Sequence, residues 1–384
     1  MRILFISSPS FADCDFPLIR TFQEKGVDVT YLLLLPPFLL RSTLIDIKKQ
    51  YPKTGIIPAS IYPELQAYSQ YMDLSKVFVS NRTGKSRLTL SYYKEIWDIC
   101  KFIRKGRFDL VHSDNCFCGF HRLIYRFGTF VTTFHDPFPH TGEQSNHQKA
   151  DYQYIVNHSR GIVLLNKTQR DMFCNEYSVA KSRVLINRLG VYDNIKQFVG
   201  NDSKTTNNIL FFGRISPYKG IEYLCEAMKT VHDRFPETTL TIAGGGKMYF
   251  DITPYQHLGY IEIINHYVGL EELAGLISRT LFCVCPYTDA TQSGVIMTCF
   301  AFGKPVIATN VGGMAESIEH GKSGLLVPPK DIVALANAII RLLEDRHSLS
   351  AMSDYIIDEY TKGEKSWDAI ADRYVEYYQR ISDG

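Results

Sequence analysis

Several features that would place the sequence in a class at once are absent or scarce. Its nine cysteines are scattered and form no C-x-x-C, so buried reduced thiols are expected rather than zinc ligands or disulfides. No D-x-D stands in a suitable loop, and no His or Cys spacing indicates a metal site. No apolar run is long enough to span a bilayer. The net charge of only +2 gives no general reason to expect a nucleic-acid partner.

What is present indicates a soluble, globular, cytoplasmic protein of two domains. The 384 residues suffice for two domains of ordinary size, and 45% hydrophobic residues let each bury a core. The N-terminal MRILFISSPS has one basic residue before a very short apolar run, which favours a first strand over a signal peptide. The polar stretch 200–208, GNDSKTTNN, lacks apolar periodicity and is the best candidate for a linker.

Strands and helices alternate on both sides of this linker. Short apolar runs typical of buried strands, such as 130–134 and 239–243, are separated by amphipathic segments such as 90–107 and 221–234. This alternation predicts an α/β fold with doubly wound parallel sheets.

The most informative stretch is 286–313, PYTDATQSGVIMTCFAFGKPVIATNVGG. It follows a strand-like run and contains a short apolar helix that opens at Ser293 and Gly294, so we expect a βαβ unit. The N–H groups at that helix start are placed to meet an anion, and Gly294 lets the anion approach closely. The alternative is an ordinary loop in such a sheet.

A second loop, GRISPYKG at 213–220, joins a strand to a helix and carries Arg214 and Lys219. Both side chains suit phosphate oxygens, Arg214 as a planar fork and Lys219 as a mobile charge. We expect this loop at the same sheet edge as Ser293, where the two would clamp a diphosphate. The alternative is a solvated loop with surface cations.

Three segments of the second half together resemble a known family. FFGRISPYKGIEYL, TIAGGGK and PYTDATQSGVIMTCFAFGKPVIATNVGGMAESIEHGKSGLLVPP resemble the C-terminal domain of the group 1 glycosyltransferases, family 4, over about residues 208–345. MRILFIS, VTTFHDPFPH and SWDAIADRYVEYY resemble, more loosely, that family's first strand, its histidine-bearing strand end and its returning C-terminal helix.

The resemblance implies the GT-B fold, in which two Rossmann-like doubly wound domains face a cleft. It implies an N-terminal acceptor-side domain of residues 1–200, completed by 365–384 through a helix that crosses back, and a nucleotide-sugar-binding domain of residues 205–364. The implied activity is that of a hexosyltransferase, which moves a sugar from a UDP- or GDP-linked donor with retention and without metal or other cofactor.

The resemblance also implies the roles of individual residues. Catalysis is assigned to His135, Arg214 and Lys219, and donor binding to Arg214, Lys219, Gly245, Tyr267, Val268, Gln292, Ser293, Gly294, Val295 and Thr298. Fixed cations would stabilise the charge that grows on the leaving diphosphate. His135 could donate to a sugar hydroxyl, although a histidine beside an aspartate is also common in loops for structural reasons. The glycine turn 244–246 could admit the nucleotide or only join two elements.

One departure from the family leaves the donor open. The family usually has E-x7-E around the second loop, whereas this chain has Ala290 and Thr298 at those positions. Asp289 or Gln292 could replace the first glutamate, and nothing obvious replaces the second. The alternatives are therefore a catalytically weak nucleotide-sugar-binding partner subunit, or a sugar-nucleotide epimerase of the same architecture. An epimerase would want paired carboxylates and histidines in one cleft, and the sequence does not reveal such a group.

The stretch 38–53 could bring the protein to a membrane and thus to a lipid-linked acceptor. It mixes Phe38 and other apolar residues with Arg41, Lys48, Lys49 and Lys53, which suits an amphipathic element on anionic lipid. The alternative is a helix packed on its own sheet. We expect a glycan or lipid-linked acceptor in surface polysaccharide synthesis, with the protein at the inner face of the membrane.

Overall fold

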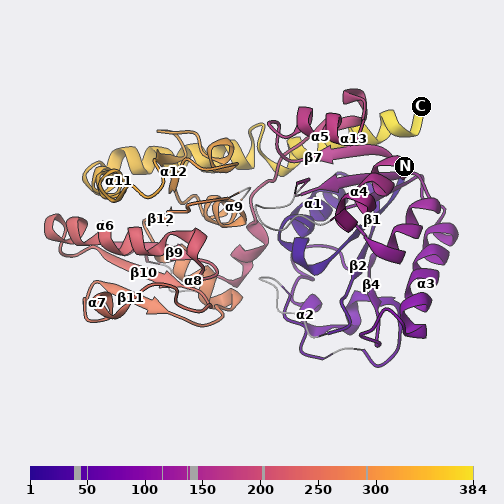
Figure 1. Cartoon of the computed structure of the whole chain (residues 1–384), viewed down its shortest axis with the longest axis horizontal. Coiled ribbons are helices and arrows are strands. Elements are labelled where there is room, and N and C mark those ends of the chain that lie inside the picture. Colours follow the sequence, from indigo (N-terminus) through magenta and orange to yellow (C-terminus); the bar gives the residue numbers. More distant parts are fainter. Residues whose placement is uncertain are drawn as a thin grey trace. The chain divides into compact units, whose positions relative to one another are not determined.

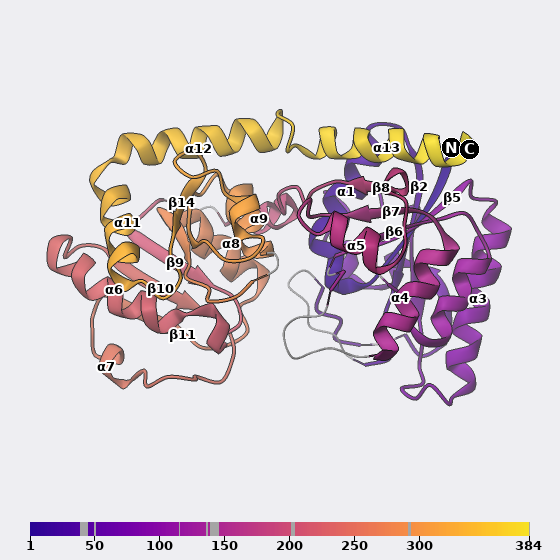
Figure 2. The same ribbon diagram turned by 45° about the horizontal axis from the view of Figure 1, so that its top comes forward.

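Two separate β-sheets organise the chain, and each belongs to its own unit (Figures 1 and 2). The computed structural model describes residues 1–38, 45–49, 51–114, 116–135, 137–138, 146–200, 204–290 and 293–383. Unit 1 comprises Met1–Gly190 together with the segment from Trp367 onward, and unit 2 comprises Val191–Ser366. The first domain was predicted to reach residue 200. Residues 191–200 belong to unit 2 because the short helix η5 (Asp193–Phe198) packs against two helices of that unit.

The sheet of unit 1 has eight strands in the described residues. In chain order they are β1 (Arg2–Ser7), β2 (Asp28–Leu34), β3 (Gly55–Pro58), β4 (Val77–Asn81), β5 (Leu110–Ser113), β6 (Phe130–Phe134), β7 (Ser159–Leu164) and β8 (Val184–Ile186). Their spatial order is β3-β4-β2-β1-β5-β6-β7-β8, and all neighbouring pairs of described strands are parallel except β3 and β4. The predicted doubly wound parallel sheet is confirmed, with one antiparallel strand added at its edge.

Helices cover both faces of this sheet (Figures 1 and 2). In unit 1 they are α1 (Ala12–Glu24), α2 (Pro63–Gln66), α3 (Leu90–Gly106), α4 (Asn146–His158), α5 (Arg170–Glu176) and α13 (Trp367–Asp383). Alternation along β1 sends Leu4 and Ile6 into a core shared with α3 and α4. Phe5 points the other way and stacks on His112, which contacts Tyr378 of α13.

The C-terminal helix α13 is part of unit 1, as the sequence predicted. The Tyr377 hydroxyl accepts from the Ile162 N–H at 2.9 Å and donates to the Arg183 carbonyl at 2.6 Å. The Asn187 amide donates to the Ile370 carbonyl at 3.3 Å. These bonds fasten α13 to the end of the sheet formed by β7 and β8.

Unit 2 has a parallel sheet of six strands in the described residues. They are β9 (Asn208–Phe212), β10 (Thr239–Ala243), β11 (Ile261–Ile264), β12 (Phe282–Cys285), β13 (Val306–Thr309) and β14 (Gly324–Val327), in the spatial order β11-β10-β9-β12-β13-β14. The helices are α6 (Ile221–Arg234), α7 (Thr253–Gln256), α8 (Leu270–Arg279), α9 (Gly294–Ala301), α10 (Met314–Ser317), α11 (Ile332–Glu344) and α12 (Arg346–Thr361). Asp331 caps α11, since its carboxylate accepts from the Ala334 N–H at 2.9 Å.

Each sheet reverses its winding at one place, between β1 and β5 in unit 1 and between β9 and β12 in unit 2. In open α/β sheets, ligands bind beyond the carboxyl ends of the strands at such a reversal. The loops that follow these four strands are therefore the places to look for a site.

Two further expectations concern the surface and the thiols. Within the stretch 38–53, Ile45 and Ile47 are buried, Phe38 is 54% exposed, and Arg41 lies outside the described residues. The described part of this stretch contains no helix.

All nine cysteines are described and free, and seven are buried. As far as the chain is described, its helices are too short or too polar to cross a membrane.

Candidate functional site

The loops that follow β9 and β12 touch each other in unit 2. Gly220 has φ 62°, and a Cβ atom there would lie 2.1 Å from the Pro286 carbonyl oxygen. The Thr288 N–H donates to the Tyr218 carbonyl at 2.7 Å. Only glycine allows the first contact, so residue 220 fixes how the two loops meet. The two loops that the sequence predicted to cooperate therefore lie side by side.

Lys219 is a buried cation in this junction. Its side chain lies over the Tyr287 ring, with Nζ 3.7 Å from the centroid, and the residue is only 8% exposed. Burial lowers the pKa of Lys219 to about 8; Cys285 opposes this shift and the Arg214 charge adds to it. No carboxylate contributes to the shift. The ring face stabilises the ammonium group, but a counter-anion is not provided by the described residues. Arg214, by contrast, is exposed.

The start of α9 lies beside this junction. Ser293 is the residue before the helix. Its buried hydroxyl lies near the hydroxyl of Tyr287, but the two groups do not form a hydrogen bond of normal geometry. Gly294 is needed here because a Cβ would lie 2.9 Å from the Tyr192 ring. Val295 faces Gly213, where a Cβ would be 3.8 Å from the Val295 methyl group. The predicted helix start thus borders the 213–220 loop.

The glycine turn after β10 packs against the same loop. A Cβ at Gly244 would lie 1.9 Å from the Gly213 carbonyl oxygen, and the Ile215 N–H donates to the Gly245 carbonyl at 3.1 Å. A Cβ at Gly245 would come within 3.4 Å of the Tyr267 nitrogen. Contacts with neighbouring backbone therefore explain these glycines without a nucleotide. The same contacts place Gly245 beside the 213–220 loop and Tyr267 beside Gly245.

The remaining predicted donor residues differ in their surroundings. Tyr267 is 41% exposed and Val268 is half-buried. Thr298 is buried inside α9, and its hydroxyl donates to the Gly294 carbonyl at 2.9 Å. That hydroxyl is therefore used within the helix. Asp289 is exposed, and Gln292 lies outside the described residues.

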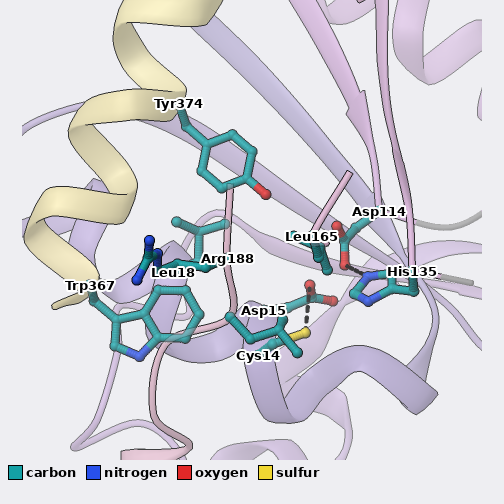
Figure 3. A pocket seen from close by; sticks show the side chains of 10 residues that line it. Cys14, Asp15, Leu18, Asp114, His135, Leu165, Arg188, Trp367 and Tyr374 are labelled. Carbon is teal, nitrogen blue, oxygen red and sulfur yellow. Dashed lines mark hydrogen bonds and ion pairs between the residues drawn. The ribbon is translucent and has the colours of Figure 1, made fainter. Parts of the chain in front are cut away.

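Unit 1 has its own polar cluster at the reversal between β1 and β5 (Figure 3). His135 follows β6, and its Nε2 lies 2.7 Å from a carboxylate oxygen of Asp114, the residue that follows β5. The imidazole also stacks on Phe11, with ring centroids 4.0 Å apart. His135 is thus held from two sides. The sequence analysis missed Asp114, although a polar residue directly after a buried strand is a usable signal.

The two carboxyl groups of this cluster, Asp114 and Asp15, have pKa values shifted in opposite directions. Burial alone would raise the pKa of the Asp114 carboxyl, but His135 and His112 together hold it below its usual range. Burial, and then the Asp114 charge, raise the pKa of Asp15 well above its usual value, and the Asp15 carboxyl is hydrogen-bonded to Asp114. The Tyr31 hydroxyl donates to Asp15 at 2.8 Å.

His112 lies in the core of unit 1, where both of its ring nitrogens have partners. Burial lowers its pKa, which keeps the ring neutral. Its two nitrogens lie 2.8 Å from the Thr133 hydroxyl and 2.5 Å from the Tyr378 hydroxyl. Both nitrogens are thereby used inside the core, so His112 is not free to act on a substrate.

A cavity of about 10 Å³, roughly the space of one water molecule, lies within this cluster, and Arg188 and Tyr374 also line it (Figure 3). The ligand atoms of Cys14, Asp114 and His135 lie within 4.8 Å of one another, so their sulfur, oxygen and nitrogen could hold a transition metal. Burial raises the pKa of Cys14 well above its usual value, which keeps it a thiol. The hydrogen bond between His135 and Asp114 explains their proximity without an ion.

Among the comparisons with known proteins, the family match lies in the second half of the chain. Residues 206–345 match the model of the family described as Glycosyl transferases group 1. The chain carries a group 1 glycosyltransferase domain. An uncharacterised glycosyltransferase of Methanocaldococcus jannaschii is 29% identical over 57% of this chain and 59% of its own length. A D-inositol 3-phosphate glycosyltransferase of Corynebacterium urealyticum is 24% identical over 71% of this chain and 72% of its own.

Likeness to solved structures extends beyond the group 1 domain to the whole chain. The Anabaena protein Alr3699/HepE, crystallised with UDP, has a TM-score of 0.62 at 17% identity, over 100% of this chain and 99% of that one. The structural neighbours are GT-B glycosyltransferases, and the predicted GT-B fold is confirmed. The match with the Methanocaldococcus relative spans less than two thirds of its length.

Proposed function

We propose that this chain is a retaining glycosyltransferase of the hexosyltransferase type. It moves a sugar from a UDP- or GDP-linked donor to a glycan or lipid-linked acceptor, without a metal. The observation that carries the proposal is buried Lys219, which has no acidic partner in the described residues and lies at the loop junction of a group 1 domain. A nucleotide diphosphate supplies the missing negative charge. The UDP bound to the Anabaena neighbour supports this class of donor.

In the proposed reaction, unit 2 holds the leaving group. Cleavage of the sugar–phosphate bond increases the negative charge on the diphosphate, and Lys219 and Arg214 stabilise it as it forms. The N–H groups at the start of α9 contribute in the same sense through the helix dipole. Because Lys219 is already ordered over Tyr287, little reorganisation is needed when the charge develops.

His135 is the group of unit 1 that we assign to the donor sugar. Asp114 orients the imidazole, because its carboxylate lies 2.7 Å from Nε2 of the ring. Asp114 is thereby a positioning residue. The stacking of the ring on Phe11 supports this assignment, because it holds the imidazole from a second side.

The acceptor and the cellular setting are further parts of the proposal. We place the enzyme in surface polysaccharide synthesis, at the inner face of the membrane. The cations Lys48, Lys49 and Lys53 are exposed and could contact anionic lipid. Burial of Ile45 and Ile47 leaves the described part of that stretch with few apolar side chains to insert.

The test is a panel of nucleotide sugars. Thermal shifts with UDP, GDP, ADP and their sugars identify the base, and product formation with and without acceptor identifies transfer. NMR of the product shows whether the anomeric configuration is retained. Binding of a nucleotide sugar without turnover on any acceptor would favour the weakly catalytic partner subunit instead.

A second candidate function is favoured by one observation. The Asp15, Asp114 and His135 cluster provides the paired carboxylates and histidine that an epimerase requires, which the sequence did not reveal. Such an enzyme would exchange a sugar hydrogen with solvent in the absence of any acceptor. Deuterium incorporation or an isomerised sugar in heavy water would support it, and clean transfer without exchange would exclude it.

A further inference from the structure

Helix α3 carries its most apolar exposed side chains on the side that faces away from the sheet. Its inner face buries Tyr92, Ile96, Ile99 and Ile103 in the core of unit 1. The outward positions recur at spacings of three and four residues, which places them along one stripe of the helix. They are Leu90, Tyr93, Lys94, Trp97, Lys101 and Arg104. In Figures 1 and 2, α3 lies on one face of the sheet of unit 1.

Five apolar side chains form what we call the α3 patch. Leu88 and Leu90 are each 89% exposed and Trp97 is 66% exposed. Tyr93 is 46% exposed and packs in a tilted arrangement against Phe120, which is 54% exposed, with ring centroids 5.9 Å apart. Single exposed apolar residues are ordinary, whereas a group this exposed on one helix end indicates an interaction surface.

Basic residues surround the α3 patch. Residues 82–107 contain eight Lys and Arg but only two Asp and Glu, in a chain whose net charge is +2. The two acids are already neutralised. Glu95 is buried between Arg82 at 3.3 Å and His121 at 3.0 Å, and Asp98 pairs with Lys94 at 2.5 Å. The cations left over on this surface are Lys85, Arg87, Lys101, Arg104, Lys105 and Arg107.

We propose that the α3 patch and its surrounding cations bind the surface of an anionic lipid bilayer. Leucines would enter the boundary between headgroups and acyl chains, Trp97 and Tyr93 would lie at headgroup level, and the cations would meet lipid phosphates. The helix lies on the membrane and does not span it. The excess positive charge opposes pairing with a second copy through the same face, and the exposed leucines have no role in binding a nucleic acid.

This surface adjoins the stretch 38–53 discussed above. The Lys94 ammonium group donates to the Thr54 carbonyl at 3.0 Å, and the Asn81 amide donates to the Lys53 carbonyl at 2.7 Å. The first of these bonds places Thr54, the residue after that stretch, next to α3. The proposal extends the proposed function by naming where a lipid-linked acceptor would be approached, but binding to vesicles does not depend on sugar transfer.

The experiment is cosedimentation of the full chain with vesicles of phosphatidylglycerol and phosphatidylcholine, or of phosphatidylcholine alone, at low and high salt. We expect binding to the anionic vesicles at low salt. Lys101→Glu with Lys105→Glu should weaken it about 25-fold or more, since each cation near such a surface contributes roughly a factor of five. The matched pair Lys48→Glu with Lys49→Glu should weaken it less. If that pair has the larger effect, the stretch 38–53 is the contact instead.

The apolar part of the surface is tested by Leu88→Asp with Leu90→Asp. Leu90 is the first residue of α3, where an acidic side chain suits the helix dipole, so the fold should persist. We expect loss of vesicle binding with an unchanged circular dichroism spectrum. Wild-type protein that stays in the supernatant under every condition would overturn the proposal. So would self-association of wild-type chains that these two substitutions abolish, because a second copy would then be the occupant.

Tryptophan fluorescence gives a residue-specific readout. The chain has two tryptophans, and Trp367 is only 7% exposed. Trp97 should therefore account for a blue shift on binding anionic vesicles, and Trp97→Phe should remove the shift. A shift that persists in Trp97→Phe would contradict the assigned surface. Nucleotide-sugar turnover, measured without vesicles, should be unchanged in all these variants, which separates failure of this proposal from failure of the proposed function.

Discussion

The Lys219 ammonium group lies 3.7 Å from the centroid of the Tyr287 ring, which itself is completely buried. The lysine comes from the loop after β9 and the tyrosine from the loop after β12, so the contact joins the two sides of the winding reversal. A buried cation over an aromatic face, without a carboxylate, is costly unless an anion joins it.

The first prediction concerns the two cations. Lys219→Ala and Arg214→Ala should each lower turnover by about 10²–10³, the usual loss when a group that stabilises transition-state charge is removed. The fold should persist, as judged by circular dichroism and thermal unfolding. Lys362→Ala removes a cation that is 80% exposed at the end of α12 and serves as the control. Near-normal kinetics in both loop variants would rule out the diphosphate clamp.

The second prediction is a pH dependence. The pKa of Lys219 is lowered to about 8 in the free protein, so the side chain loses its charge as pH rises through that value. The kcat/KM for the donor should therefore fall above about pH 8, because this ratio reports the free enzyme. Lys219→Arg keeps its charge throughout and should lack that decline. A decline that survives in Lys219→Arg would assign it to another group.

Stability should change in the opposite direction over the same range. Between about pH 8 and the ordinary lysine pKa of 10.5, the unfolded chain binds more protons at Lys219 than the folded chain does. The free energy of unfolding contributed by this group therefore rises with pH. Urea unfolding of wild type and of Lys219→Ala should be measured across this pH window. The free energy of unfolding should rise with pH more steeply in wild type than in the variant.

The third prediction compares two glycines that each precede a helix. Gly220→Ala places a side chain in a left-handed conformation, with its Cβ 2.1 Å from the Pro286 carbonyl oxygen. It should destabilise the protein by about 2 kcal/mol or more and weaken nucleotide binding, because the loops after β9 and β12 must separate. Gly269→Ala meets nothing within 4 Å and should change unfolding by less than about 0.5 kcal/mol. Equal effects in the two variants would refute the assigned loop junction.

The fourth prediction concerns Asp114. Asp114→Asn keeps the shape but removes the charge next to His135, and we expect kcat to fall about tenfold to hundredfold. The affinity for the nucleotide, measured by thermal shift, should not change, since Asp114 does not belong to the Lys219 loops. Asp98→Asn breaks an exposed pair with Lys94 and is the matched control. A loss of nucleotide affinity equal to the loss of kcat would point to a general structural role for Asp114.

The fifth prediction is that activity survives chelation. Arg214 and Lys219 supply the positive charge that a divalent cation would otherwise bring to the diphosphate. Turnover after dialysis against EDTA should equal that of untreated enzyme. Cys14→Ser removes one of the three groups that could gather a metal and should leave that result unchanged. Activity lost in EDTA and restored by Mg²⁺ or Mn²⁺ would reverse this part of the proposal.

Much of the fold could be predicted because central parallel strands are short, continuous apolar runs. The strands 130–134 and 239–243 were predicted with the bounds that the structure has. The edge strand β3 was not predicted, because the half-buried Gly55–Pro58 has no continuous apolar run.

The candidate site was predictable at the level of loops and less so at the level of contacts. Arg214, Lys219 and Ser293 could be singled out because each occurs in a recognisable loop. The partners of these residues could not be inferred, because Tyr287 and Asp114 lie at the ends of other strands and meet Lys219 and His135 only in the folded sheets. The burial of Ile45 and Ile47 was also hidden, since the sequence pattern fits a membrane face and a core equally well.

The packing of α13 against unit 1 affects how the chain folds during synthesis. Residues 1–190 leave the ribosome first, but the helix that covers Phe22 and bonds Ile162 comes last, after all of unit 2. At about 5–20 residues per second, the first unit would wait on the order of ten seconds or more with that face uncovered. Unit 2 is continuous and can fold in this interval. A stop codon before Trp367 would therefore damage the part of the protein that was translated first.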